Sequence, residues 1–314
     1  MIKEYNKLSY FSFRALFMGI GLSKILTSTH SYFFISIIIG TILGLIIMYL
    51  YNNTTNKYIS IISNLLLLIM LFTIIINMIS TMYLTDMSRL MIGIPFLLLI
   101  IYQITKPNVN IYRVANILLI LNLTIYIFAS FSLTKYIDLT NIEFTNFNLK
   151  TIISNSILYA LFSISPYIFN KDENTVKYKS YKTYIISSIT LSLIFFFTIS
   201  ILGNSLIEIY RYPEYIILKK VSFTNAIENI ENIVCFMWIF DIYMLMINSA
   251  NQIKNNVSNK ILLYLILINS LFIAIIILKY YQLTLLMYNY SGIVLGILLL
   301  LNIIFHKKTL VRIS

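Results

Sequence analysis

Apolar residues recur along the chain in runs of about twenty, and short polar stretches separate them. When helical, an apolar run of this length matches the thickness of a bilayer. A window of about 19 residues places ten runs near 9–27, 31–51, 59–83, 90–104, 112–133, 152–169, 183–206, 229–248, 261–278 and 284–305. The pattern predicts an all-α integral membrane protein with about ten transmembrane helices in one transmembrane domain, 1–314.

The composition supports this interpretation and narrows the functions available to the chain. Hydrophobic residues make up 59% of it, charged residues 11%, and the mean hydropathy is +0.86, values that exclude an ordinary soluble domain. The net charge of +12 comes from Lys and Arg scattered between the apolar runs rather than gathered on one face, so we expect no nucleic-acid partner. No connecting stretch is long enough to fold as a separate domain. Function must therefore reside in the helical bundle, whose immediate partner is the lipid bilayer.

The fourth run, RLMIGIPFLLLIIYQ, leaves the helix count open between nine and ten, because it is short and contains Gly93 and Pro95. With ten helices and a cytoplasmic N-terminus, the positive charges favour both termini inside, in a bacterial cytoplasmic membrane. The fourteen inner Lys and Arg residues would be Lys3, Lys7, Lys57, Lys106, Arg113, Lys171, Lys177, Lys179, Lys182, Lys254, Lys260, Lys307, Lys308 and Arg312. The eight outer ones would be Lys24, Arg89, Lys135, Lys150, Arg211, Lys219, Lys220 and Lys279.

Residue types that carry most enzyme chemistry are scarce. Cys235 is the single cysteine, which excludes an intramolecular disulfide and a Cys-based metal cluster, and His30 and His306 are far apart near the ends of apolar runs. We therefore predict no catalytic residues, no metal site, no cofactor and no enzyme activity. Ile, Asn, Lys and Tyr are all abundant, so an isolated Asn or Tyr within a run is given no functional weight.

Two apolar runs are interrupted at their middle. The first contains Gly19, Ile20 and Gly21, and the sixth contains Ser163, Ser165 and Pro166. Glycine costs about 1 kcal/mol and proline about 3 kcal/mol relative to alanine within a helix, and an opened membrane helix exposes backbone groups that a ligand can satisfy. Because these runs begin two five-helix halves, about 8–133 and 152–305, the pairing favours a binding site near the bilayer midplane. The alternative is structural: the glycines let another helix approach, and the proline only kinks its helix.

Carboxylates occur at the start of the eighth run and within it. Glu228 and Glu231 lie at its expected outer mouth, where solvated residues at the start of a helix are a sufficient explanation for Glu228. Asp241 lies about 18 Å deeper along a helix, where an ionisable group is a functional candidate that faces the bundle or a cavity. The alternative for Asp241 is a protonated side chain hydrogen-bonded to a neighbouring helix. Trp238 lies on the same side as Glu231, which we expect to face protein.

Arg14 is the other charge within an apolar run. It lies about one turn from the expected inner surface, and we predict that its side chain snorkels to that surface.

The segment YPEYIILKKVSFTNAIENIENIVCFMWIF resembles the corresponding region of the B subunits of bacterial spore germinant receptors, members of the amino acid–polyamine–organocation transporter superfamily. That family has an aromatic-Pro turn, one or two basic residues, a Glu-Arg-x-Glu-like start of a helix and a Trp near its middle. The matching residues here are Tyr212, Pro213, Lys219, Lys220, Glu228, Glu231 and Trp238, with Asn229 at the position of the usual Arg. FMGIGLSKIL resembles the family's Gly-x-Gly first helix, and IPFLLLIIYQITKPNVNIYRVANILL resembles its fourth and fifth helices.

The resemblance implies a bundle of two inverted five-helix repeats whose first and sixth helices are discontinuous. It would bind a small nutrient, such as an amino acid, near the midplane. The implied ligand-binding residues are Gly19, Ile20, Gly21, Ser163, Ser165, Pro166, Trp238 and Asp241. In this family the subunit senses a germinant and signals to partner A and C subunits in the spore inner membrane.

Two other functions compete with the receptor, and the transporter is the stronger of them. A proton- or Na⁺-coupled amino acid transporter of the same fold would use Asp241 as its coupling group. A membrane acyl- or glycosyltransferase needs acid and base groups near a membrane face, and the sequence offers no Ser-His, His-Asp or metal-ligand arrangement of that kind.

Overall fold

The computed structural model describes residues 14, 28–50, 56–106, 108–144, 147–168, 181–210, 212–220 and 230–311. These residues form helices joined by turns, and no β-strand occurs among them. The helices are α3 (Phe33–Leu50), α4 (Lys57–Met82), α5 (Arg89–Ile104), α6 (Asn108–Leu133), α7 (Leu149–Ile168), α9 (Tyr181–Ile209), α10 (Pro213–Leu218), α11 (Ile230–Asn256), α12 (Lys260–Lys279) and α13 (Tyr281–Val311). Three 3₁₀ turns accompany them: η2 (His30–Tyr32), η3 (Thr134–Tyr136) and η4 (Leu139–Asn141).

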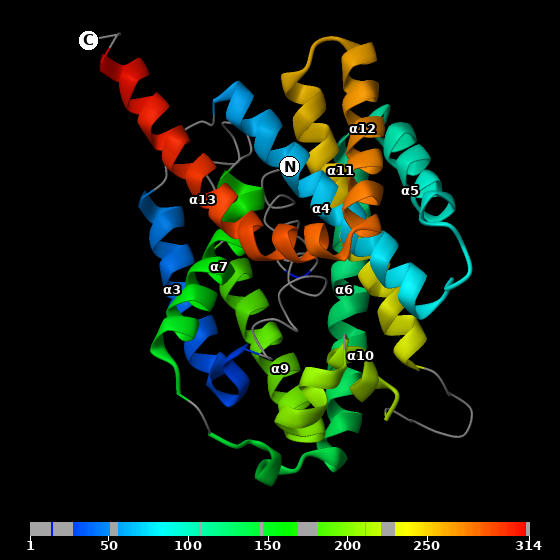
Figure 1. Ribbon diagram of the computed structural model, residues 1–314, viewed down its shortest axis with the longest axis vertical. Coiled ribbons are helices and arrows are strands. Elements are labelled where there is room, and N and C mark those ends of the chain that lie inside the picture. Colours follow the sequence, from blue (N-terminus) through cyan, green and yellow to red (C-terminus); the bar gives the residue numbers. More distant parts are fainter. Residues whose placement is uncertain are drawn as a thin grey trace.

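Each predicted apolar run from the second to the tenth overlaps one described helix (Figure 1), and the short helix α10 lies between the seventh and eighth runs. Six are long and apolar enough to cross a membrane: His30–Tyr49, Lys57–Met82, Arg113–Tyr136, Tyr181–Ile209, Asn232–Asn256 and Lys260–Lys279. Arg89–Ile104, Leu149–Ser165 and Tyr290–Ile304 are shorter apolar helices. The first predicted run, 9–27, lies outside the described residues except for Arg14. The chain is therefore an all-helical, multi-pass membrane protein, as the hydrophobic pattern predicts.

The outward surfaces of these helices are apolar, as a bilayer requires. On α3, Ile35, Ile38, Ile42 and Ile46 are all exposed and recur every three or four residues, so they form one stripe along the helix. A stripe of isoleucines exposed to water would be unfavourable, whereas the same stripe facing lipid carries no such penalty.

The helices pack into two groups (Figure 1). In one, α3 packs against α7 and α9; in the other, α4 packs against α5, α11 and α12. Glycines permit the close approach of α3 and α7, because a Cβ on Gly40 would lie 2.7 Å from Tyr159 Cδ1 and 2.8 Å from the Ser156 carbonyl oxygen. Gly44, one turn further, leaves room for the hydroxyl of Tyr184.

The expected opening of the sixth predicted helix does not occur within α7. This helix continues through Ser163 and Ser165 to Ile168, although Pro166 has no N–H to donate to the Phe162 carbonyl. The Ser165 hydroxyl donates to that same carbonyl at 2.9 Å and so replaces the missing backbone hydrogen bond. The prediction of a break at Ser163–Pro166 is therefore wrong for residues 149–168.

A break occurs instead in α9, at Gly203, whose φ of 73° lies in the left-handed region that favours glycine. The carbonyl of Ser200 accepts hydrogen bonds from the Asp138 backbone N–H at 3.1 Å and from Asn141 Nδ2 at 3.0 Å. The segment around η4 thus satisfies a backbone group that the break leaves open, as a non-helical region within a membrane bundle requires.

Candidate functional site

Asp241 lies in the interior of the bundle, on α11, with 1% of its surface exposed. Asn122 on α6 donates a hydrogen bond from Nδ2 to Asp241 Oδ1 at 2.8 Å. Arg14 Nη1 lies 3.6 Å from Asp241 Oδ2, which makes an ion pair. Asp241 therefore faces the interior of the bundle and accepts a hydrogen bond from a neighbouring helix.

The prediction that Arg14 snorkels to the membrane surface is wrong. Arg14 is 3% exposed, and its guanidinium carbon lies 3.8 Å from the centre of the Tyr126 ring. An arginine snorkels when water is the only partner for its charge, whereas here a carboxylate and the face of an aromatic ring supply partners inside the protein.

Trp238 extends the same arrangement. It is buried one turn before Asp241 on α11, and its Nε1 donates to the Tyr126 hydroxyl at 2.6 Å. The interior charged cluster, as we call it, therefore comprises Arg14, Asn122, Tyr126, Trp238 and Asp241. It joins α6, α11 and residue 14 of the chain.

Burying such a pair brings little net stability. Removing two charges from water costs several kcal/mol per ion, and their attraction in the interior repays this only when geometry and additional hydrogen bonds are good. Ionisable groups within a membrane bundle are uncommon and usually mark a site for a solute, an ion or a proton. The interior charged cluster is therefore the strongest candidate functional site in the described part of the chain.

The other predicted site residues lie elsewhere or outside the described residues. Ser163 is buried on α7, where its hydroxyl lies 2.7 Å from the Tyr184 hydroxyl, and the Ser165 hydroxyl bonds within α7. Helix α7 packs against α3 and α13, whereas α11 packs against α4, α5 and α6. The two serines and the interior charged cluster thus belong to different helix contacts.

Three predicted site residues, Gly19, Ile20 and Gly21, lie outside the described residues, as does Glu228 at the expected outer mouth. Glu231 lies in the first turn of α11, and Pro166 near the end of α7, with only their backbone described. Their roles in binding remain predictions.

Sequence reasoning missed Asn122 and Tyr126, because isolated Asn and Tyr residues were given no weight. Their spacing does carry a signal. Residues four apart lie on one face of a helix, so Asn122 and Tyr126 place an amide and a phenol together on α6, and both contact groups of α11.

A second buried carboxylate lies outside the membrane-spanning segments. Glu214 on α10 is 2% exposed, and its Oε2 has no hydrogen-bond partner. Burial raises the pKa of this carboxyl to about 8, which favours the neutral form at neutral pH. The flanking tyrosines attach α10 to the bundle: Tyr212 accepts a hydrogen bond from Asn77 of α4 at 3.1 Å, and Tyr215 donates to Asn232 of α11 at 3.2 Å.

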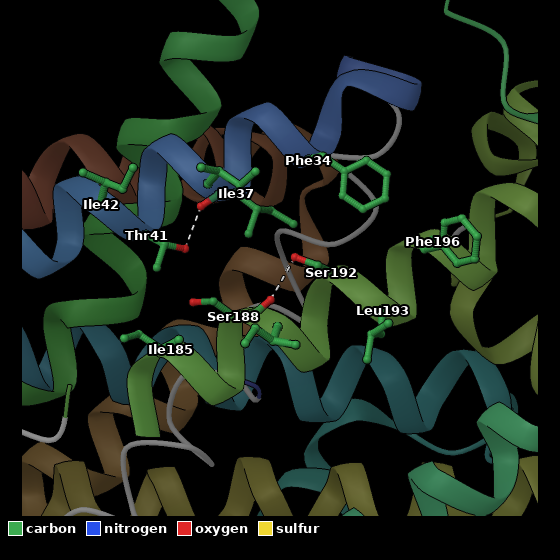
Figure 2. Close-up of a pocket in the computed structure, with 11 residues that line it drawn as sticks. Phe34, Ile37, Thr41, Ile42, Ile185, Ser188, Ser192, Leu193 and Phe196 are labelled. Carbon is green, nitrogen blue, oxygen red and sulfur yellow. Dashed lines mark hydrogen bonds between the residues drawn. The ribbon is translucent and has the colours of Figure 1, made fainter. Parts of the chain in front are cut away.

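A groove of about 510 Å³ runs between α3 and α9 (Figure 2). Its lining is apolar apart from three hydroxyl groups. Thr41 donates to the Ile37 carbonyl at 2.6 Å, and Ser192 donates to the Ser188 carbonyl at 2.9 Å, as Figure 2 shows. Ser188 donates to the Tyr184 carbonyl on its own helix. Ser188 Oγ also accepts a hydrogen bond from the Tyr159 hydroxyl of α7 at 2.9 Å. Since all three hydroxyls already have partners in the protein and exposed Ile38 and Ile189 line the groove, it belongs to the lipid-facing surface.

Among the described residues, no three His, Cys, Asp or Glu side chains gather as a metal site would require. Comparison of the chain with known protein families and with curated proteins finds no matching family model and no matching relative.

Proposed function

We propose that this chain is the nutrient-sensing membrane subunit of a spore germinant receptor, which binds a small zwitterionic germinant, such as an amino acid, and signals to A and C partner subunits. The observation that carries the proposal is the ion pair of Arg14 and Asp241 in the bundle interior. The resemblance of the segment from Tyr212 to Trp238 to the B subunits of such receptors supplies the biological context.

The proposed fold is ten transmembrane helices in two inverted five-helix repeats. Under this arrangement α3, α4 and α5 are the counterparts of α9, α11 and α12. The packing supports it, because each of these helices contacts its own counterpart: α3 with α9, α4 with α11, and α5 with α12. Contacts between helices that are not counterparts occur twice, once from each repeat: α4 contacts α12, and the counterpart α11 contacts the counterpart α5. A two-fold relation between the repeats requires this exchange.

The chemistry of the interior charged cluster suits an amino acid. A zwitterion carries one carboxylate and one ammonium group, so it can separate the pair of Arg14 and Asp241 and give each charge a new partner. The guanidinium would bind the carboxylate through two hydrogen bonds, and Asp241 would bind the ammonium group. Because opening the existing pair costs less than creating two unpaired buried charges, the site is prepared for a ligand of balanced charge.

Ligand binding tests this proposal directly. The purified chain is screened against amino acids, nucleosides and sugars by thermal unfolding, and we expect a saturable stabilisation by one or more amino acids. The Asp241→Asn variant should lose that response, while Asp138→Asn, which alters an exposed carboxylate in the turn before η4, should keep it. Stabilisation by an amino acid that persists fully in Asp241→Asn would refute the proposed site.

The germinant response is a separate test. Spores that lack this chain should lose the response to one nutrient selectively, measured as loss of refractility, and Gly21→Leu should abolish it while the protein remains in the membrane. If every nutrient response survives deletion of the chain, the receptor role is wrong.

A coupled amino acid transporter is the second candidate, favoured by the position of a carboxylate within a membrane-spanning helix. It predicts uptake by the chain alone in liposomes, driven by a proton or Na⁺ gradient. Uptake that remains fully gradient-dependent in Asp241→Asn would exclude this residue as the coupling group.

A further inference from the structure

The groove between α3 and α9 owes its depth to small residues on its floor. Ser188 and Ser192 are four residues apart, so both lie on one side of α9, and Thr41 of α3 lines the same groove (Figure 2). Ser188 is buried, whereas Ile38 of α3 and Ile189 of α9 are exposed. The hydroxyl residues therefore form the floor, and the larger isoleucine side chains form the rims.

The groove suits a hydrocarbon chain. Its volume of about 510 Å³ is within the range of sites that bind a single small molecule. All three hydroxyl groups of the floor already have hydrogen-bond partners in the protein, so the lining does not require a polar ligand. A hydrocarbon chain would fill the space with van der Waals contacts and leave no polar group unsatisfied.

The length of the groove matches one leaflet of a bilayer. Ile42 and Ile185 line one end, and Phe34 and Phe196, whose ring centroids are 6.4 Å apart, line the other (Figure 2). The distance from Ile185 to Phe196 along α9 is about 16–17 Å, close to half of a hydrocarbon core about 30 Å thick. An acyl chain in one leaflet occupies the same depth.

A positive charge lies beyond the Ile185 end of the groove. Lys182 is three residues before Ile185 and seven before Ile189, so it lies on the same side of α9 as the rim. It is exposed and forms no ion pair with any residue that the structure describes. The membrane spans of α9 and α3 end here, at Tyr181 and Tyr49, and Tyr and Lys are typical of the membrane interface. An exposed lysine at this depth attracts the phosphate groups of anionic lipids.

We propose that the groove binds one acyl chain of an anionic phospholipid, whose phosphate group contacts Lys182. Such a lipid brings in one molecule the hydrocarbon chain that fits the floor and the negative charge that the lysine attracts. It would fill the space between α3 and α9 from Ile185 to Phe196 and so hold the two helices together. This site is separate from the interior charged cluster and does not depend on the germinant role.

The test is thermal unfolding of the purified full chain in a neutral detergent, titrated with dioleoyl phosphatidylglycerol or with zwitterionic dioleoyl phosphatidylcholine, which has the same acyl chains. We expect phosphatidylglycerol to raise the unfolding temperature saturably, and at a lower concentration than phosphatidylcholine. Lys182→Gln should weaken the affinity for phosphatidylglycerol about fivefold, the contribution of one lysine near an anionic headgroup. Ser192→Leu should abolish the saturable response to both lipids, because its side chain occupies the space of the acyl chain.

Two matched variants serve as controls. Lys260→Gln alters an exposed lysine at the start of α12, predicted on the same side of the membrane as Lys182. Thr124→Leu alters an exposed residue of α6 whose hydroxyl, like that of Ser192, bonds to a carbonyl of its own helix. Both controls should keep the full difference between the lipids.

Three outcomes would overturn the proposal. The first is an equal response to the two lipids, and the second is an undiminished response in Lys182→Gln or in Ser192→Leu. Because Lys182 is exposed, its variant keeps the test decisive whatever Ser192→Leu does to folding. The third is a wild-type chain that shows no lipid response and forms dimers that Ser192→Leu disrupts, which would assign the groove to a second copy of the chain.

Discussion

Separating the contributions of Arg14 and Asp241 tests whether the interior charged cluster behaves as one unit. At 3.6 Å and an effective dielectric constant of about 20, two opposite charges attract by about 4–5 kcal/mol, before the cost of desolvation is subtracted. Replacing Asp241 with Leu leaves the guanidinium buried beside Tyr126 without its carboxylate, and replacing Arg14 with Met leaves the carboxylate with Asn122 alone. Each single change should destabilise the protein by about 3–5 kcal/mol.

The double variant Arg14→Met, Asp241→Leu should cost much less than the sum of the two, because it leaves neither charge unpaired. We therefore expect a coupling energy of at least about 2 kcal/mol in a double-mutant cycle. The measurement is reversible unfolding of the purified chain in mixed detergent micelles, followed by the intrinsic fluorescence of Trp238 and by circular dichroism. Single effects that simply add in the double variant would refute the pairing and with it the ligand chemistry derived from it.

Three further predictions concern other parts of the bundle. Burial raises the pKa of Glu214 from 4.5 to about 8, so this carboxyl stabilises the folded state most below pH 4.5. Between pH 4.5 and 8 its contribution declines by up to about 1.4 kcal/mol per pH unit. Glu214→Gln should flatten this part of the stability profile measured by thermal unfolding, and an unchanged slope would contradict the burial. Gly40→Ala should destabilise by about 1–3 kcal/mol through contact with Tyr159, whereas Gly292→Ala, with its nearest neighbour at 3.5 Å, should be neutral or stabilising in the same denaturation assay. Tyr126→Phe removes the acceptor of the Trp238 indole at 2.6 Å and should cost about 1–3 kcal/mol; loss of the hydrogen bond would appear as a shift in tryptophan emission, and an unshifted spectrum would argue against it.

The sequence predicted the helices well because bilayer thickness and backbone hydrogen bonding leave few alternatives to an apolar helix. The boundaries follow local signals that are also readable, as at Asn259, whose side chain caps the first turn of α12. The fourth predicted run became helix α5 despite Pro95 and Gly93. A Cβ on Gly93 would lie 2.5 Å from Leu271 of α12, so this glycine serves helix packing.

The candidate site was predicted only in part, because a hydropathy pattern does not show which residues that are distant in sequence contact each other. Asp241 was identified because a carboxylate in an apolar run is conspicuous by itself. Arg14 was assigned to the membrane surface because the sequence shows its distance from the end of the apolar run but does not show that Asp241 is its partner. The break at Gly203 was likewise missed, because the Ser200 carbonyl that it leaves open is satisfied by Asn141, some sixty residues earlier in the chain.

The polar groups along α11 extend the meaning of the interior charged cluster. Asp241, Asn248 and Gln252 are separated by seven and four residues, so they lie on nearly the same side of the helix, and all three are buried. Asp241 has Asn122 and Arg14 as partners, whereas Gln252 Oε1 has no hydrogen-bond partner in the protein. Water or a solute must satisfy that end of the row, because apolar side chains cannot satisfy an amide. Asp241 lies at one end of this row and Gln252 at the other, while the helix as a whole packs against α4. A change in the partner of Asp241, from Arg14 to a ligand, would therefore act on a helix that contacts α4, α5 and α6. Helix α11 is thus placed to pass a binding event at Asp241 to other parts of the bundle.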